Sequence, residues 1–439
     1  MLFSKQSTSF VCSTGYKDMF DVPEDDDNSL LRRTTPVHHA ARGGTLVSMR
    51  KVERLFCVYD RFDVNYVDEL GLTHFHAACL SGDCLHVVRK FLERGRVDPN
   101  LVWPETGDSP LHLVIRHGRH HAMAVELLLR HGADPNLPND EGHTPLHVIC
   151  QNDERYDSQR YLYHGETEKF FQVTDELNLQ LQVDARDKLG RTPLQFAVAN
   201  LLPHTVETLL DRGADLSSFV LLPEYEFTAR FDPNKDNSNY FKLSIASGAL
   251  AVLESLEKRG YEVKDFALII MKIFSRLRLF KKSTYVHTRW YDDEEFASQA
   301  EQIQILPRIL ISDYFNGDIL EFGRAMNETE MTPSLSLNDL IRLRPEEAEK
   351  ILTHWDYYDL DRTSTLLGVD LGHDWKRTVM LQLCYDRVSR GFCRRWALEY
   401  FFELIHYRLP ILCCEKIIDQ LMNEDLCNIC FAATGQDPY

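Results

Sequence analysis

In the first half of the chain, short apolar stretches alternate with polar turns at regular intervals. Most stretches open on a Thr or Ser, continue with Pro and an apolar residue, and reach a His at the fourth position. Thr and Ser are good helix N-caps and Pro suits the first helical position, so each phrase predicts a helix start, after which Leu and Ala pack inward. A Gly further along each copy, such as Gly132 or Gly213, predicts the left-handed residue that ends a second helix.

Five copies of this phrase can be aligned. They are Thr35-Pro36-Val37-His38, Thr73-His74-Phe75-His76, Ser109-Pro110-Leu111-His112, Thr144-Pro145-Leu146-His147 and Thr192-Pro193-Leu194-Gln195, and their second residues are 38, 36, 35 and 48 positions apart. A period of about 33 residues, built as a turn plus two helices, is typical of ankyrin repeats. Residues 31–260 therefore resemble an ankyrin solenoid with five clear copies and one degenerate copy. This resemblance implies an all-α fold.

Two copies depart from the pattern. The 48-residue step predicts an insertion in the fourth copy, roughly Asp153 to Glu168, which we expect to form an extended loop. The degenerate sixth copy runs from Phe241 to Gly260, with Lys242 in the place of Pro and Ser244 in the place of His. Terminal repeats of a solenoid are commonly atypical, because one face meets something other than a repeat.

The turns between copies are predicted to project as fingers, since they contain the Asp, Asn and Gly that tight turns require. We number them first to fourth: residues 68–71, 101–107, 139–142 and 187–190. An ankyrin array usually meets its partner at the fingers, so Glu69, Asp140 and Lys188 are candidate target-binding residues. Trp103, near the tip of the second finger, is a candidate anchor because large aromatic residues dominate interface energies. The same side chain could equally fold back on its own repeat.

Histidines recur with the repeat and are not catalytic candidates. As in other ankyrin repeats, we expect the phrase histidines to tie neighbouring turns together by hydrogen bonds: His38, His76, His112 and His147. Three further histidines fall in the turn between two repeat helices and are expected to be solvated: His117, His120 and His121.

Composition limits the classes of function. The chain has 439 residues and a formal net charge of -18, which argues against a nucleic-acid binder or a binder of anionic membranes. Residues 1–30 are acidic and are expected to form a loosely ordered lead. The eleven cysteines lack a compact framework, which fits reduced thiols in the cytosol or nucleus. No cofactor, no metal and no membrane span are expected.

Beyond Gly260 the repeat signal stops, and residues 261–405 are predicted to form a second helical domain. The apolar run from Phe266 to Met271 is too short for a membrane span, so it predicts a buried helix. Helical patterning continues at 303–306, 345–348 and 394–402, and the acidic run 292–295 is expected to be exposed. An enzyme in this region is a weak third hypothesis, because it has no recognisable phosphate-binding, nucleophile or zinc-protease motif.

The C-terminal residues 406–439 carry a second signal. Apolar and acidic positions follow Leu409-Pro410 at a spacing that predicts two short helices with a shared apolar face, and Asn423 can cap the second. This spacing resembles the start of an F-box. Its position after ankyrin repeats resembles the domain called pox protein repeats of ankyrin C-terminal, found in poxviruses and parasitoid wasps. Such domains are regarded as truncated F-boxes that recruit a Skp-type adaptor to a cullin scaffold. The residues this implies for adaptor binding are Leu409, Pro410, Ile417, Ile418, Leu421, Asp425 and Leu426.

The C-terminal segment also departs from the F-box pattern. The fourth position is usually Glu and here is Leu412, the fifth is Cys413 where an aliphatic residue is usual, and almost no room remains for a third helix. A second interpretation is that these helices only cap the helical domain. We interpret Cys427 and Cys430 as buried helical cysteines rather than zinc ligands, because the segment is predicted to be helical and lacks the Gly-containing turns of a zinc knuckle.

The sequence thus predicts an adaptor: the ankyrin array binds a protein target, and the F-box-like helices deliver it to a Skp–cullin ubiquitin ligase. The alternative is a stoichiometric binder that masks its target, as ankyrin inhibitors of the NF-kappaB type do. Leu412 is the residue that most favours masking.

Overall fold

The computed structural model describes residues 17–18, 30–44, 46–82, 84–94, 97–117, 121–151, 166–228, 239–280, 304–305, 335–336, 343, 353–355, 357–358 and 375–436. The chain divides into two compact units. The first holds residues 1–197 and 208–218, and the second holds residues 198–207 and 219–439. Almost every described element is a helix, so the expected all-α class is confirmed.

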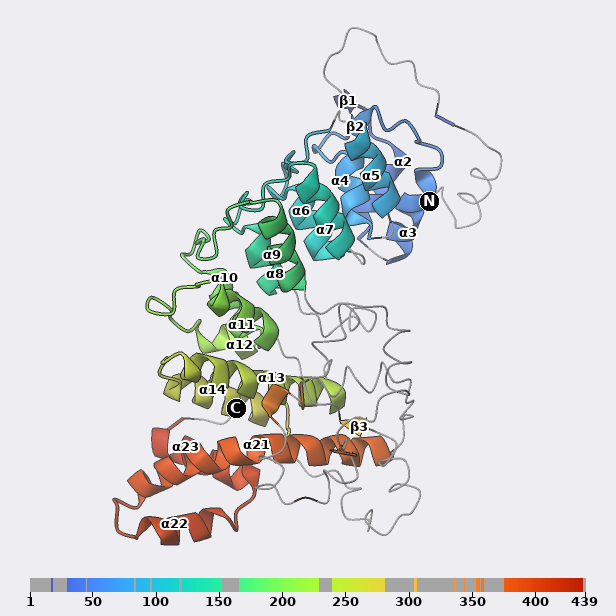
Figure 1. Ribbon diagram of the computed structural model, residues 1–439. Coiled ribbons are helices and arrows are strands. Elements are labelled where there is room, and N and C mark those ends of the chain that lie inside the picture. Colours follow the sequence, from blue (N-terminus) through green and yellow to red (C-terminus); the bar gives the residue numbers. More distant parts are fainter. Residues whose placement is uncertain are drawn as a thin grey trace, which may run out of the picture. The chain divides into compact units, whose positions relative to one another are not determined.

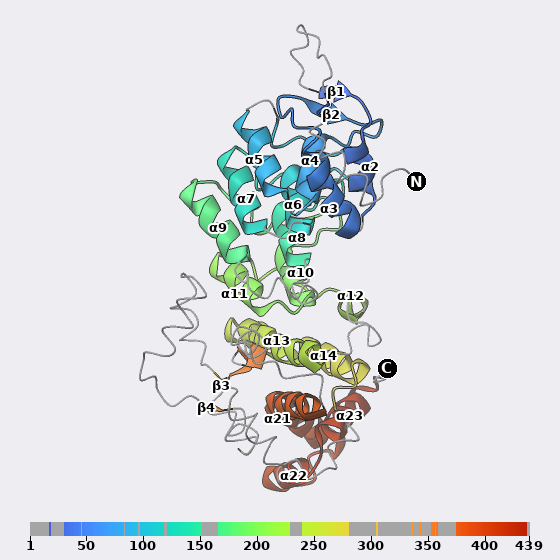
Figure 2. The same ribbon diagram turned by 90° about the vertical axis from the view of Figure 1, so that its right-hand side faces the viewer.

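The first unit is a stack of short helix pairs (Figures 1 and 2). The helices are α2 Pro36–Arg42, α3 Leu46–Leu55, α4 His74–Leu80, α5 Leu85–Glu93, α6 Pro110–His117, α7 His121–Arg130, α8 Pro145–Gln151 and α9 Glu166–Glu176. Two further helices, α10 Pro193–Ala199 and α11 Pro203–Asp211, each contain residues of both units. First helices pack on first helices, as α4 does on α2 and α6, and second helices on second helices, as α7 does on α5 and α9. Each layer buries its own apolar side chains, such as Phe75, Phe91, Leu128, Leu146 and Phe170.

A short parallel ladder starts the stack. Strand β1, Leu30–Arg32, pairs with β2, Asn65–Val67.

Buried histidines connect consecutive layers, as the sequence predicts. The Nδ1 atom of each phrase histidine accepts the backbone N–H of the N-cap residue, at 3.0 Å from Thr35 to His38 and 3.2 Å from Ser109 to His112. Each Nε2 atom lies against a carbonyl of the next turn, at Tyr66, Leu101, His143 and Arg191, over 2.6 to 3.2 Å. Since Nδ1 accepts, Nε2 carries the proton, and these imidazoles are neutral.

The fingers are shaped by Asx turns. Asp68, Asn139 and Asp187 each accept two backbone N–H groups of their own finger through one side-chain oxygen, as Asn139 does from Glu141 at 3.0 Å and from His143 at 2.9 Å. Gly142 has a φ of +82°, and a Cβ atom there would lie 2.7 Å from the backbone nitrogen of Lys188. Only Gly fits this position, because the next finger approaches so closely.

The second unit is built around one long helix. Its described elements are α12 Glu224–Thr228, α13 Asn239–Lys258, α14 Lys264–Arg276, β3 Gln304–Ile305, β4 Leu335–Ser336, α21 Trp375–Leu404, α22 Ile411–Ile418 and α23 Asn423–Thr434. Helices α13 and α23 both pack along α21, and α14 also contacts α23. Figures 1 and 2 place α22 on the side of α21 and α23 that faces away from α13 and α14. The buried run expected from Phe266 to Met271 lies in α14, as predicted, with Ile269 the one residue of the run that is partly exposed.

Three expectations need correction. The degenerate sixth copy does not form a helix pair, because Asn239–Lys258 is one continuous helix of 20 residues. Without Pro or a turn sequence at its centre, nothing interrupts the helical hydrogen bonds. Residues 304–305, predicted as helical, form strand β3 and pair with β4. Asn423 does not cap α23 with its side chain, which is buried against α21 instead, and the N-cap residue is Met422.

Several predictions lie on residues outside the described ranges. They are most of the acidic lead at 1–30, most of the insertion at 153–168, His120 of the predicted histidine turn, and the runs 292–295 and 345–348. The other two histidines of that turn are helical instead, since His117 ends α6 and His121 begins α7. The predicted boundaries at 260 and 405 also stay predictions.

The histidine contacts predict how stability depends on pH. Burial lowers the pKa of His76 and of His147 to about 4 in the folded chain. A histidine whose pKa is lower when folded than when unfolded binds fewer protons in the native state, so stability must fall as pH drops below about 6.5. We expect a loss of about 1 kcal/mol per pH unit for each such histidine between pH 6.5 and 4, measured by urea unfolding.

The control is His147→Gln. Gln195 fills the equivalent place in the next copy, where its Oε1 atom accepts the Thr192 N–H at 2.8 Å. The variant should keep the cap bond and show a shallower pH dependence than the natural chain. Equal slopes for the two proteins would show that His147 titrates alike in the folded and unfolded states.

Candidate functional site: fingers and C-terminal hairpin

Three of the four predicted target-binding residues are exposed on fingers. Glu69, Asp140 and Lys188 lie on the first, third and fourth fingers, and the Asx turns beneath them fix the backbone. Successive fingers are also joined directly, because Asp140 N–H donates to the Thr106 carbonyl at 3.2 Å and Lys188 N–H donates to the Glu141 carbonyl at 3.0 Å. The first unit therefore brings Asp140 and Lys188 onto neighbouring, mutually bonded fingers.

Trp103 packs on its own array. Its side chain is half-buried, and the Arg42 guanidinium lies over the ring, 5.6 Å from the centroid. Arg42 is itself held by Asp68 at 2.8 Å and by Glu105 at 2.8 Å. Of the two interpretations of Trp103, this geometry favours the one in which it braces the finger.

The sequence reasoning missed the apolar finger tips. Leu70 is 60% exposed on the first finger and Leu189 is 75% exposed on the fourth. Each stands directly before the turn Gly, where a Leu makes no contribution to turn formation. This position before the Gly was the signal in the sequence that could have identified them. Leu70 and Leu189 add two exposed apolar side chains to fingers that also carry the charged Glu69 and Lys188.

The seven residues predicted for adaptor binding separate into two groups. Leu409, Pro410, Ile417 and Asp425 are exposed and Leu421 is half-buried, whereas Ile418 and Leu426 are completely buried. The Asp425 carboxylate accepts the Met422 N–H at 3.1 Å and so holds the start of α23. The hairpin of α22 and α23 thus buries one row of its apolar residues and exposes another.

The exposed row is larger than the sequence reasoning suggested. Ile411 is 53% exposed and Leu412 is 68% exposed, and Tyr407 and Met422 at the two ends of α22 are 65% and 46% exposed. Of the eight residues of α22, only Cys414 and Ile418 are buried. These two lie one turn apart on the face towards α21, which leaves Ile411, Leu412 and Ile417 exposed to water.

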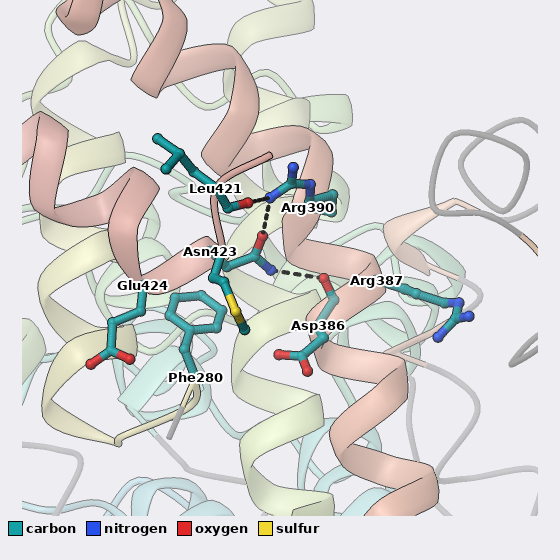
Figure 3. A pocket seen from close by; sticks show the side chains of 8 residues that line it. Phe280, Asp386, Arg387, Arg390, Leu421, Asn423 and Glu424 are labelled. Atoms are coloured by element: carbon teal, nitrogen blue, oxygen red, sulfur yellow. Dashed lines mark hydrogen bonds between the residues drawn. The ribbon is translucent and has the colours of Figure 1, made fainter. Parts of the chain in front are cut away.

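Arg390 of α21 holds the hairpin in place (Figure 3). Its Nη1 atom donates to the Leu421 carbonyl at 2.6 Å and to Asn423 Oδ1 at 3.2 Å, and its Nη2 atom donates to the Asp419 carbonyl at 3.1 Å. The carbonyls at the end of α22 lack helical partners, so a guanidinium there satisfies groups that water would otherwise solvate. Arg394, one turn further along α21, adds an ion pair to the Asp419 side chain at 2.6 Å.

Together with Arg390, Asn423 forms a clamp of polar contacts between α21 and the turn that follows α22. Its Nδ2 atom donates to the Asp386 carbonyl at 2.9 Å and lies 3.2 Å from Ser389 Oγ, so the turn between α22 and α23 is bonded to α21 from both sides. Figure 3 shows Arg387 pointing away from this cluster. Behind the turn lies a cavity of about 290 Å³, lined by Phe280, Asp386, Arg387, Arg390, Leu421, Met422, Asn423 and Glu424. Polar contacts therefore position the turn where apolar packing is incomplete.

The C-terminal cysteines take part in packing. Cys414, Cys427 and Cys430 are buried and Cys413 is exposed, with Cys427 Sγ 3.7 Å from Cys393 Sγ of α21. Within the described ranges, no three His, Cys, Asp or Glu side chains are grouped so that they could hold a metal ion. None of the helices in those ranges is long and apolar enough to cross a bilayer.

Comparison with known proteins identifies the repeats. The sequence pattern of ankyrin repeats (3 copies) matches residues 75–175. The chain is 36% identical over 110 residues to Neurogenic locus notch homolog protein 4 of Homo sapiens, covering 25% of this chain and 5% of that protein. It is 40% identical over 97 residues to Ankyrin repeat and MYND domain-containing protein 1 of Mus musculus, covering 21% and 10%. It is 23% identical over 275 residues to Palmitoyltransferase AKR1 of Lachancea kluyveri, covering 57% and 33%.

These matches cover at most a third of each relative named. They show that the chain contains ankyrin repeats, which are modules of protein–protein interaction. A role in binding other proteins follows for this chain.

The clamp formed by Arg390 and Asn423 predicts that α22 becomes less ordered when Arg390 is replaced. Arg390→Met removes a cation from the carbonyls of Ile418, Asp419 and Leu421, and hydrogen bonds to charged groups contribute about 1.5–3 kcal/mol each. We expect the local stability of residues 411–426 to fall by about 2–3 kcal/mol, measured as faster amide hydrogen exchange in α22 and the start of α23.

The matched control is Arg276→Met, which removes an exposed arginine from α14. It should leave exchange in α22 unchanged, and neither variant should alter exchange in α13. If Arg390→Met left α22 as protected as in the natural chain, Cys414 and Ile418 alone would hold this helix.

Proposed function

We propose that this protein is an adaptor: the ankyrin array binds a protein target, and the C-terminal hairpin recruits a Skp-type adaptor and, through it, a cullin ubiquitin ligase. The observation that carries the proposal is the exposed apolar face of α22, with Ile411 and Leu412 more than half exposed. A helix that served only to cap a domain would bury such a face. Contiguous exposed apolar residues are typical of protein interaction sites.

The predicted adaptor-binding residues take separate roles in this proposal. Leu409, Pro410 and Ile417 contact the adaptor directly, together with Ile411 and Leu412. Ile418 and Leu426 fasten the two helices to α21, since both are completely buried. Leu412 stands where an F-box usually has Glu, and in this proposal it contributes apolar contact area in place of a charge.

The adaptor itself makes and breaks no bonds. Holding a target beside the ligase raises the effective concentration of the target's lysines, and the transfer step becomes nearly intramolecular. The exposed finger residues Glu69, Leu70, Asp140, Lys188 and Leu189 are the proposed target contacts.

The test of adaptor recruitment is co-precipitation from cells, probing for the Skp adaptor and the cullin. We expect both to be recovered with the full chain. Recovery should be lost with a chain that ends at Arg408, with Leu409→Ala plus Pro410→Ala, and with Leu412→Asp, because a charge on the apolar face must be desolvated on binding. A loss of at least tenfold is expected for the charged variant.

The control for Leu412→Asp is Met123→Asp. Met123 is 57% exposed on α7 and is equally apolar, but it lies in the first unit. This variant should recover the adaptor like the natural chain. Absence of adaptor and cullin from precipitates of the folded full chain would refute ligase recruitment.

A second candidate function is target masking without ligase recruitment. Leu412 in place of the usual F-box Glu favours it, and so do the apolar finger tips, which could bind a target unaided. Deletion of residues 409–439 separates the two proposals. If the protein is a masking binder, the truncated chain keeps its full cellular effect, whereas an adaptor would still bind the target and lose the effect.

A further inference from the structure

His143 lies between two carboxylates that come from neighbouring fingers. It is 3% exposed, directly after the third finger. Its Nδ1 atom is 2.9 Å from Glu141 Oε2, and its Nε2 atom is 3.3 Å from Asp187 Oδ2 in the fourth finger. Its backbone is fixed as well, since its N–H donates to Asn139 Oδ1 at 2.9 Å and its carbonyl faces His112 Nε2 at 2.8 Å.

This geometry suits only one protonation state. A carboxylate accepts hydrogen bonds and donates none, so each ring nitrogen must carry a proton to bond its partner. A neutral imidazole has a single N–H and would turn a lone pair towards the other carboxylate. Only the imidazolium can bond both, and its positive charge strengthens both contacts.

We propose that protonation of His143 ties the third finger to the fourth, and that this tie sets the spacing of the exposed Asp140 and Lys188. The tie forms when the ring carries both N–H protons and is released when it loses one, so a lower pH favours it. The inference deepens the proposed target-binding role of the fingers, because it names a proton as a regulator of that surface.

The charged and titratable groups packed on His143 are compatible with a cation. Arg191 bonds Asp187 at 2.8 Å, and although burial alone would raise the pKa of Asp187, hydrogen bonds from the Arg191 backbone and side chain keep it lowered. Asp187 thus stays ionised. The stacked ring of His147, 5.6 Å away, is neutral because burial lowers its pKa to about 4. The Gln151 side-chain nitrogen lies 3.3 Å from His143 Nε2, and against an imidazolium this amide would turn its oxygen to the ring. Phe196 meets the ring edge-on.

The next repeat provides a natural comparison. Arg191 follows the fourth finger as His143 follows the third, and it carries a permanent charge that pairs with Asp187. A cation is therefore accommodated at this position of the repeat. His143 differs from Arg191 in that its charge depends on a proton that the ring can release.

The test measures hydrogen exchange of the Lys188 amide in the full chain. This amide donates to the Glu141 carbonyl across the two fingers, at 3.0 Å, and so reports their contact. After correction for the intrinsic exchange rate, the protection factor of Lys188 should fall about tenfold between pH 5.5 and 7.5. The amide of Asp140, which bonds the second finger, should change much less.

Two substitutions separate charge from shape. His143→Gln is neutral at all pH values and should show low, pH-independent protection at Lys188, while His143→Arg should show high protection at both pH values. His131→Gln, at an exposed histidine of the same array, should behave like the natural chain. An unchanged protection factor in the natural chain, or the same fall in His143→Gln, would overturn the proposal.

This experiment needs no target protein. Failure of the finger tie and failure of target or adaptor binding are therefore separate results, since the second is decided by co-precipitation.

Discussion

The repeat array depends on a neutral imidazole that bonds in two directions. In the first four copies, Nδ1 accepts the N–H of the helix cap and Nε2–H reaches a carbonyl of the next turn, as His112 does between Ser109 and His143. Each bond contributes only about 1 kcal/mol net, but a buried carbonyl left without a donor would cost more. The histidines therefore fix the register of successive copies, and the finger turns and stacked helices follow from that register.

Much of this architecture could be predicted from the sequence, because repetition exposes the physical rules. The recurring cap, Pro, apolar residue and His predicted where α4, α6, α8 and α10 begin, to within a residue or two. The Asx and Gly residues of the fingers predicted their turns. A spacing alone also located α22 and α23, although Asn423 turned out to bond α21 with its side chain.

Other features depend on contacts between distant residues, which no local pattern contains. Whether Ile411 or Ile418 faces solvent depends on where α21 lies, and both are equally apolar. Arg390 is one of many arginines until the carbonyl ends of α22 approach it. Trp103 could be assigned only when Arg42, 61 positions earlier, was found over its ring. His143 was overlooked because the carboxylate of Asp187 lies 44 residues away from it.

The exposed face of α22 has a consequence for the supply of the protein. A folded chain that keeps Ile411 and Leu412 in water resembles a partly unfolded one to chaperones and proteases, which recognise exposed apolar segments. Coverage of that face would remove the resemblance. The steady-state amount of this chain would then follow the abundance of whatever covers α22, so that surplus copies are cleared and the two components stay in proportion.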